Sequence, residues 1–99
     1  MTLANKLPLG LKQSRKRNPA HLARVAQLPC VICGSRPVEV HHVICGRYGQ
    51  RRATDEDTIP LCYNHHRGPE GIHTIRAEWV ARYGEDHEWL PHVRRWMEE

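Results

Sequence analysis

Two short pairs of metal-binding residue types stand out in this 99-residue chain. Cys30-x-x-Cys33 and Cys62-x-x-His65 each have two intervening residues, a spacing that lets one turn direct both side chains at a single ion. Because a Cys₃His set is typical of closed, tetrahedral zinc sites, we predict that these residues hold a structural Zn²⁺ ion. The alternative is thiols that are merely buried. The remaining Cys45 has no such partner. It could replace His65 as the fourth ligand, but a small buried thiol is the simpler interpretation.

Four histidines near these pairs could carry a second kind of chemistry: His41, His42, His66 and His73. Adjacent residues of a strand point to opposite faces, so His41 and His42 should have different roles. Three neutral imidazoles around a divalent ion leave positions open for water and phosphate, as in catalytic sites. A further histidine beside the ion can act as a general base because its pKa lies near neutrality. Taken singly, each histidine could instead be an ordinary structural or surface residue.

Short helices and strands must position these side chains. The expected elements are a helix over 19–28 capped by Asn18, a strand over 38–44, a basic loop over 45–57, a strand over 58–62, a helical turn over 62–66, a break over 68–71, a helix over 73–83 and a last helix capped by Asp86. The order predicts an α+β fold. Trp79, Trp89 and Trp96 lie at helical spacing beside Leu and Val, so we expect them in the core.

The composition predicts one small domain that needs a stabilising cross-link such as a bound metal ion. Hydrophobic residues make up 39% of the chain and phenylalanine is absent, so the core is thin and a metal would add the missing stability. No apolar run approaches the length of a membrane span, and no secretory signal is evident. We therefore expect a cytoplasmic protein with no membrane partner, in a compartment where closely spaced cysteines more often bind metal than form disulfides.

The net charge of +4 is unevenly distributed. Residues 1–38 contain seven basic residues and no acidic ones, whereas residues 39–99 contain eight basic and eleven acidic residues. We divide the chain into a basic, extended arm over 1–17 and a single domain over 18–99. A basic arm commonly follows phosphates, although it can also serve only solubility.

The order of motifs resembles the HNH endonucleases, also called ββα-metal or His-Me finger nucleases. The likeness rests on Cys-x-x-Cys, a strand with His-His, then Leu-Cys-x-x-His-His and a later histidine, and it spans Pro29 to about Tyr83. Within the family, the segments Pro-Cys-Val-Ile-Cys-Gly, Val-Glu-Val-His-His-Val and Gly-Ile-His look most like phage recombination-enhancement nucleases, which act with a RecA-type recombinase. The resemblance implies a small ββα-metal fold with a CxxC…CxxH zinc knuckle and flanking helices.

The resemblance also implies roles for individual residues. His41, His66 and His73 match the ligands of a catalytic Mg²⁺, Mn²⁺ or Zn²⁺ ion, and His42 matches the general base. Asp57 stands where the family has an Asn that orients the base, and His65 stands where many members have a knuckle Cys. Here seven positions separate His66 from His73, where the family usually has four. Because seven residues of helix rise about 10.5 Å, residues 68–71 must fold back for both to reach one ion.

The implied activity is metal-dependent hydrolysis of DNA phosphodiester bonds with low sequence specificity, in phage or mobile-element DNA recombination within a bacterial host. A RecA-type recombinase filament is a possible partner. The residues expected to contact DNA are Lys12, Arg15, Lys16, Arg17, Arg47, Arg51, Arg52 and Arg67. Two other functions fit parts of the pattern. A non-catalytic zinc module would explain the knuckle but not the four histidines, and a small toxin nuclease would share the chemistry with a different target.

Overall fold

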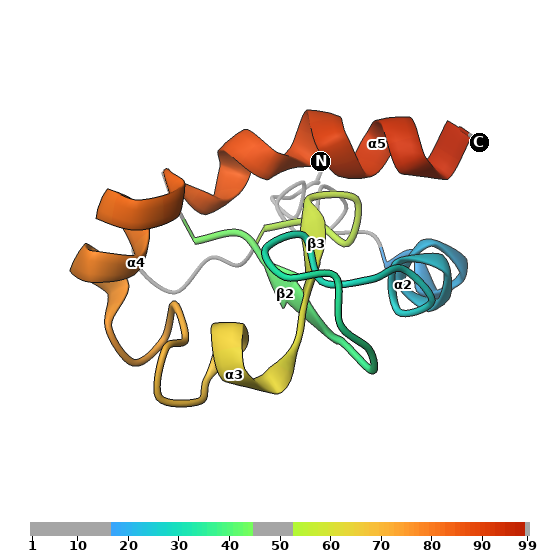
Figure 1. Cartoon of the computed structure of the whole chain (residues 1–99). Coiled ribbons are helices and arrows are strands. Elements are labelled where there is room, and N and C mark those ends of the chain that lie inside the picture. Colours follow the sequence, from blue (N-terminus) through green and yellow to red (C-terminus); the bar gives the residue numbers. More distant parts are fainter. Residues whose placement is uncertain (1–16, 45–52, 99) are drawn as a thin grey trace, which may run out of the picture.

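A two-stranded antiparallel sheet lies at the centre of the molecule (Figure 1). The computed structural model describes residues 17–44 and 53–98. Strand β2 (Glu39–His42) pairs with β3 (Thr58–Leu61), with Glu39 opposite Leu61 and His42 opposite Thr58. Both strands lie within the predicted ranges and are shorter than expected. All four residues of β3 are buried, including Pro60, whose missing N–H is tolerated because its strand pairs on one side only in the described part of the chain.

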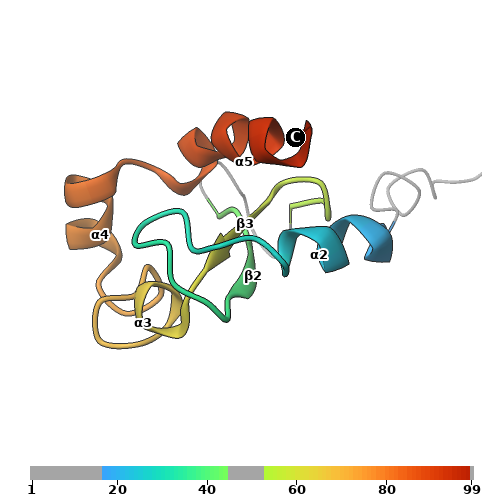
Figure 2. The ribbon, with the colours of Figure 1, turned by 45° about the vertical axis from the view of Figure 1, so that its right-hand side comes forward.

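In the described ranges, five helical segments surround this sheet: α2 (Pro19–Val25), α3 (Tyr63–His66), α4 (Arg76–Tyr83), the 3₁₀ helix η1 (Asp86–Trp89) and α5 (Leu90–Glu98). Helix α5 lies across one side of the sheet and α3 lies at the opposite end of the strands (Figures 1 and 2). Helices α2 and α5 contact β3 and each other, whereas α3 contacts both strands. The predicted α+β class is confirmed. Within 17–44 and 53–98, no helix is long and apolar enough to cross a bilayer.

Local sequence signals explain where most helices begin and end. Asn18 caps α2 by accepting a hydrogen bond from the His21 amide over 3.2 Å, and Pro19 occupies the first turn, where its missing N–H costs nothing. Gly84 ends α4 with a φ of 86°, a left-handed conformation that favours glycine. Helix α4 begins at Arg76 rather than near 73, because the preceding residues form a tight turn.

Asp86 does not have the role predicted for it, which was to cap the last helix. Glu85 occupies the N-cap position of η1, and the Asp86 carboxylate is fully buried, where it accepts a hydrogen bond from the Ile44 amide. A carboxylate is rarely buried without such partners. The contact therefore ties the C-terminal helices to the end of β2.

The hydrophobic core is small and lies between the sheet and the C-terminal helices. Its fully buried members include Ile59, Leu61, Ile72 and Trp79. The indole N–H of Trp79 donates to the His65 carbonyl over 3.1 Å, so the largest core side chain also satisfies a backbone acceptor of α3. Trp89 and Trp96 are half-buried and pack against the same core. The prediction that the three tryptophans serve packing is confirmed.

Candidate metal centres

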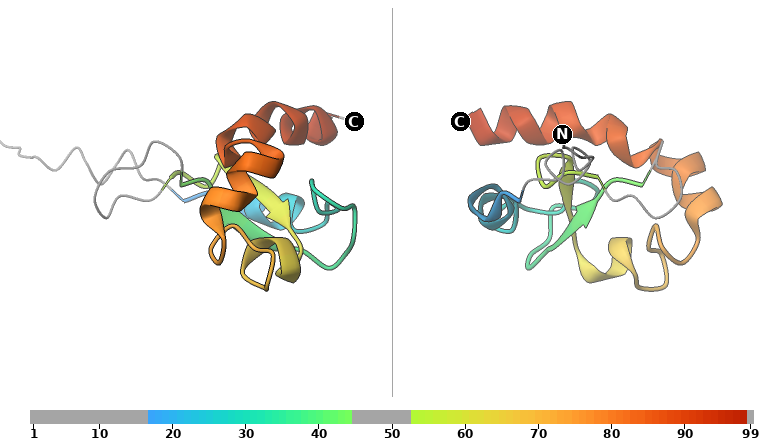
Figure 3. Two further views of the ribbon diagram at one scale, coloured as in Figure 1. Left: turned by 60° about the vertical axis from the view of Figure 1, so that its left-hand side comes forward. Right: turned by 180° about the vertical axis from the view of Figure 1, so that it is seen from behind.

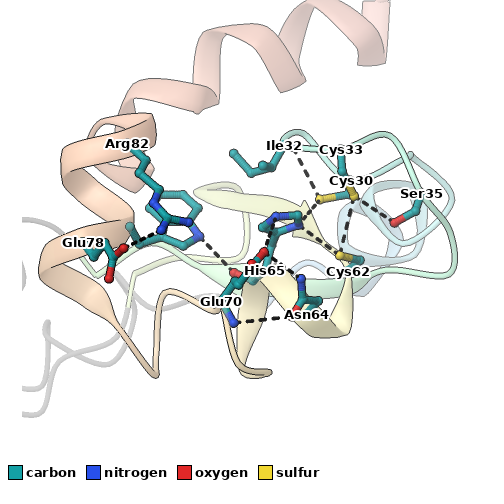
Figure 4. Close-up of polar contacts among 11 residues, drawn as sticks. Cys30, Ile32, Cys33, Ser35, Cys62, Asn64, His65, Glu70, Glu78 and Arg82 are labelled. Atoms are coloured by element: carbon teal, nitrogen blue, oxygen red, sulfur yellow. Dashed lines mark hydrogen bonds and ion pairs between the residues drawn. The ribbon is translucent and has the colours of Figure 1, made fainter.

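The sulfur atoms of Cys30, Cys33 and Cys62 converge with the ring of His65 (Figure 4). Cys33 Sγ and Cys62 Sγ are 3.7 Å apart, and His65 Nδ1 lies 3.3 Å from Cys62 Sγ and 4.0 Å from Cys30 Sγ. Tetrahedral zinc with bonds of 2.3 Å to sulfur and 2.0–2.1 Å to nitrogen separates its ligands by about 3.8 Å (S to S) and 3.6 Å (S to N). The cluster, which we call the knuckle, can therefore hold a metal ion such as zinc.

Two tight turns bring the knuckle residues together. The amide of Gly34 donates to the carbonyl of Cys30 over 2.8 Å, and Gly34 adopts a φ of 79°, which closes the first turn. The Val31 amide donates to the Pro60 carbonyl over 3.1 Å, which fastens this turn to β3. Cys62 directly follows β3 and occupies the N-cap position of α3, which carries His65. The cysteine pair and the Cys–His pair thus meet because β3 joins their turns.

A second cluster, the histidine trio, consists of His41, His66 and His73. Their ring centroids form a near-equilateral triangle, with separations of 5.1, 5.1 and 4.9 Å. One nitrogen from each ring lies within 4.8 Å of the others, so the three can converge on one ion. His41 is buried, His66 is half-buried and His73 is exposed, which leaves the cluster open to solvent on the side of His73. The three residues grouped in the sequence prediction are together in space.

Residues 67–71 fold back and place His73 beside His66. The Ile72 amide donates to the His65 carbonyl, and the His73 amide donates to the His66 carbonyl, each over 3.0 Å. A Cβ atom at Gly71 would lie 2.5 Å from the carbonyl carbon of His66, so the two backbone segments approach as closely as only glycine permits. The predicted turn is confirmed, and it is the reason that a spacing of seven positions is compatible with one site.

Two histidines of the trio each contact a carboxylate. His41 Nε2 lies 2.8 Å from Asp86 Oδ2, and His66 Nδ1 lies 2.7 Å from Glu39 Oε1. Hydrogen bonds from Arg67 and then from His66 lower the pKa of Glu39 to about 2, so it is ionised at neutral pH. Burial lowers the pKa of His66, which favours the neutral ring that a metal ligand requires.

The side chain of His42, the last residue of β2, contacts a different carboxylate. Its Nε2 lies 2.9 Å from Asp55 Oδ1, while Asp55 Oδ2 accepts a hydrogen bond from the Asn18 amide over 2.7 Å. These bonds, with the first the largest contribution, lower the pKa of Asp55 to about 2. The structure corrects the expectation that Asp57 orients His42: the Asp57 carboxylate accepts from Arg94 over 3.0 Å instead. The turn that precedes β3 directs Asp55 toward His42.

Of the eight residues expected to contact DNA, two lie in the described part of the chain. The Nε atoms of both donate to carboxylates: Arg17 to Asp55 over 3.3 Å, and Arg67 to Glu39 over 3.0 Å. Arg67 also covers the ring of the exposed Tyr63, with 5.2 Å to its centroid. Each guanidinium group is therefore linked to a histidine of the site through the carboxylate that it contacts. Lys12, Arg15, Lys16, Arg47, Arg51 and Arg52 lie outside the described residues, as does Cys45.

Sequence reasoning missed the carboxylates Glu39, Asp55 and Asp86. A signal existed for Glu39, because it lies two positions before His41 and so shares its face of β2. Asp55 is two positions from the residue chosen in its place. Asp86 is 45 positions from His41, and no spacing rule connects them.

Comparison with known proteins gives one match. The model of a family described as a protein of unknown function (DUF968) matches residues 8–96, a range that includes both clusters. No curated protein matches the chain, and no solved structure does.

Proposed function

The chain belongs to the DUF968 family of proteins of unknown function, and we propose that it is a metal-dependent DNA endonuclease of the HNH, or ββα-metal, type. One observation carries the proposal. The adjacent residues His41 and His42 lie in two different environments, the first with His66 and His73 and the second with Asp55. This is the division that phosphodiester hydrolysis needs, with one group of side chains for an ion and a separate base for water.

In this proposal the trio holds one divalent ion, Mg²⁺, Mn²⁺ or Zn²⁺. When bound, the ion would polarise a phosphate group and neutralise the charge that develops on it during hydrolysis. Three histidines leave coordination positions open, unlike the Cys₃His knuckle, whose four protein ligands complete a tetrahedron. The donor sets of the two clusters thus suit different tasks.

His42 is the proposed general base. Because the ionised Asp55 carboxylate can only accept, the Nε2 atom of His42 donates in their hydrogen bond, and Nδ1 keeps the lone pair that takes a proton from water. The bond fixes both the tautomer and the orientation of the ring. A positioned base of this kind accelerates a reaction by about 10²–10⁴-fold.

The knuckle is proposed to hold structural zinc. Zinc binding contributes about 10 kcal/mol to the folding of small domains, which suits the limited core of this chain. A non-catalytic zinc module is the competing interpretation. It accounts for the knuckle but leaves the trio and the His42–Asp55 pair without a task.

DNA is the proposed substrate because the basic N-terminal third supplies the charge that attracts phosphates without regard to sequence. Arg17 and Arg67 contact the site residues Asp55 and Glu39, which supports the proposal that they bind a phosphate there. The motif likeness further suggests phage recombination and a RecA-type filament as partner, which can be examined by adding the recombinase to the cleavage reaction.

The test is cleavage of supercoiled plasmid and of single-stranded DNA with Mg²⁺, Mn²⁺ or Zn²⁺. We expect nicking by the wild type and a loss of about 10²–10⁴-fold in His42→Ala, with DNA binding retained. His87→Ala, which removes an exposed histidine of η1, is the matched control and should cleave normally. No cleavage by the wild type with any of these ions would refute the nuclease and favour the zinc module. Equal cleavage by His42→Ala would refute the assigned base.

A further inference from the structure

We propose that Asp86 is a positioning residue of the histidine trio, fixing His41 so that its Nδ1 atom, and not Nε2, faces the ion. The proposal rests on the trio being the metal site of the proposed function. It adds to that function a residue from the C-terminal part of the chain, outside every motif that the sequence offered.

Two contacts of the Asp86 carboxylate support this role. Its Oδ2 atom lies 2.7 Å from the amide nitrogen of Ile44 and 2.8 Å from His41 Nε2. Both side chains of the Asp86–His41 pair are buried, with 0% and 1% of their surface exposed. The Ile44 amide can only donate, so this oxygen is an acceptor, and the His41 ring donates to it through Nε2–H. The nitrogen left with a lone pair is Nδ1.

His66 presents the opposite nitrogen. Glu39 Oε1 lies 2.7 Å from His66 Nδ1, so His66 offers Nε2 to the ion. The two carboxylates thus select different ring nitrogens, and together they set the directions in which the two lone pairs point. Metal-binding histidines commonly donate their other N–H to a carboxylate, which fixes the ring and makes it a stronger ligand.

The charge of Asp86 is the second feature that we connect with metal binding. A buried neutral amide could accept from the Ile44 N–H and from the His41 ring with the same geometry, and it would be less costly to desolvate. A carboxylate adds negative charge directly behind a ring that would bind a cation. Because Asp86 is the first residue of η1, its contact with His41 also makes the start of that helix part of the site.

The first test measures binding of Co²⁺ to the zinc-loaded 99-residue chain by isothermal titration and by the visible absorption of the bound cobalt. A sulfur-to-cobalt charge-transfer band would reveal exchange at the knuckle, so the two sites are distinguishable. We expect Asp86→Asn to bind Co²⁺ at the trio about 10–100-fold more weakly, because the amide oxygen can still accept from the Ile44 amide and the His41 ring while the charge is removed. Glu88→Gln makes the same chemical change at an exposed position of η1 and should leave the affinity unchanged.

The second test needs no variant and holds even if Asp86→Asn fails to fold. Long-range ¹H–¹⁵N spectra of the wild type identify which nitrogen of each ring is protonated. We expect His41 to be the Nε2–H tautomer, with its Nδ1 resonance shifting when Zn²⁺ is added beyond one equivalent. An unchanged Co²⁺ affinity in Asp86→Asn, an equal loss in Glu88→Gln, or a zinc-induced shift at His41 Nε2 would overturn the proposal. Absent DNA cleavage with these binding results intact would refute only the nuclease.

Discussion

The backbone amide of His73 donates to the carbonyl of His66 over 3.0 Å, although seven positions separate the two residues in the chain. Along a continuous helix they would be about 10.5 Å apart and could not share an ion. The fold replaces that helix by a loop that returns on itself between α3 and α4 (Figure 3). The trio therefore depends on a backbone turn as much as on its three side chains.

Gly71→Ala tests this dependence. A Cβ atom there would lie 2.5 Å from His66 C and 2.6 Å from Arg67 N, and neither backbone atom can move independently of α3. We expect a loss of about 1–3 kcal/mol in the free energy of unfolding, typical of a forced steric clash, and loss of the second ion with the knuckle ion retained. Denaturant unfolding and metal analysis of the purified protein would measure both effects.

Pro69→Ala is the matched control for Gly71→Ala, since it changes an exposed residue of the same turn. It should keep both ions. If Gly71→Ala proved as stable as the wild type and bound two ions, the close approach of the two segments would not be needed for the trio.

Asp55→Asn and Asp57→Asn form a second matched pair. Asp55 has a lowered pKa of about 2, so it stays ionised from about pH 5 to 9, and its contribution to stability is lost only as the pH falls from near 3.8 toward 2. We expect Asp55→Asn to cleave DNA more slowly. An amide can turn its NH₂ group toward His42 Nε2, whereas the ionised carboxylate can only accept, so the variant no longer fixes the tautomer of the base.

Asp57→Asn should cleave DNA at the rate of the wild type, since the Asp57 carboxylate contacts Arg94 rather than His42. Rates measured across this pH range with saturating metal ion would separate the two variants. Slower cleavage by Asp57→Asn, with an unchanged rate for Asp55→Asn, would restore the assignment made from sequence.

The sequence predicted the parts of the site that depend on short-range spacing. The gap of two residues within each short pair predicted that Cys30, Cys33, Cys62 and His65 lie together. Strand alternation predicted that His41 and His42 lie in different environments. Gly71 and its neighbours marked the return that brings in His73, because glycine permits backbone contacts that other residues forbid.

The carboxylates that accompany the histidines were not predicted. Choosing between Asp55 and Asp57 requires the conformation of the turn before β3, which no spacing rule gives. Asp86 reaches His41 only because η1 packs at the end of β2, a long-range contact set by the packing of the C-terminal helices. Its position before an apolar helix favoured a cap, and burial beside Ile44 and His41 overrode that preference.

Trp79 connects the core to the backbone of α3, and Trp79→Phe should show how much that contact contributes. The substitution keeps an aromatic ring but removes the N–H that donates to His65 O over 3.1 Å. A buried carbonyl that loses its partner costs about 1–3 kcal/mol, and we expect a loss of that size in the free energy of unfolding. Trp89→Phe also loses a bond to a carbonyl, that of Tyr83, but at a half-buried position where water can replace it. Its loss should be clearly smaller. Equal losses of stability in the two variants would show that the hydrogen bond to His65 contributes no more than the one to Tyr83.

Removing the knuckle ion should unfold the domain. Cys62→Ser replaces a thiolate ligand by a hydroxyl, a poor ligand for zinc, at the residue that joins β3 to α3. Because zinc contributes about 10 kcal/mol to small domains and whole-domain stability is about 5–15 kcal/mol, we expect the variant to lose zinc and cooperative unfolding together. Cys45→Ser makes the same change at the cysteine that the sequence leaves outside the knuckle, and it should retain one equivalent of knuckle zinc. Zinc analysis and circular dichroism during thermal unfolding would measure both variants. Zinc loss in Cys45→Ser as well as in Cys62→Ser would make Cys45 a ligand, as expected if it replaces His65.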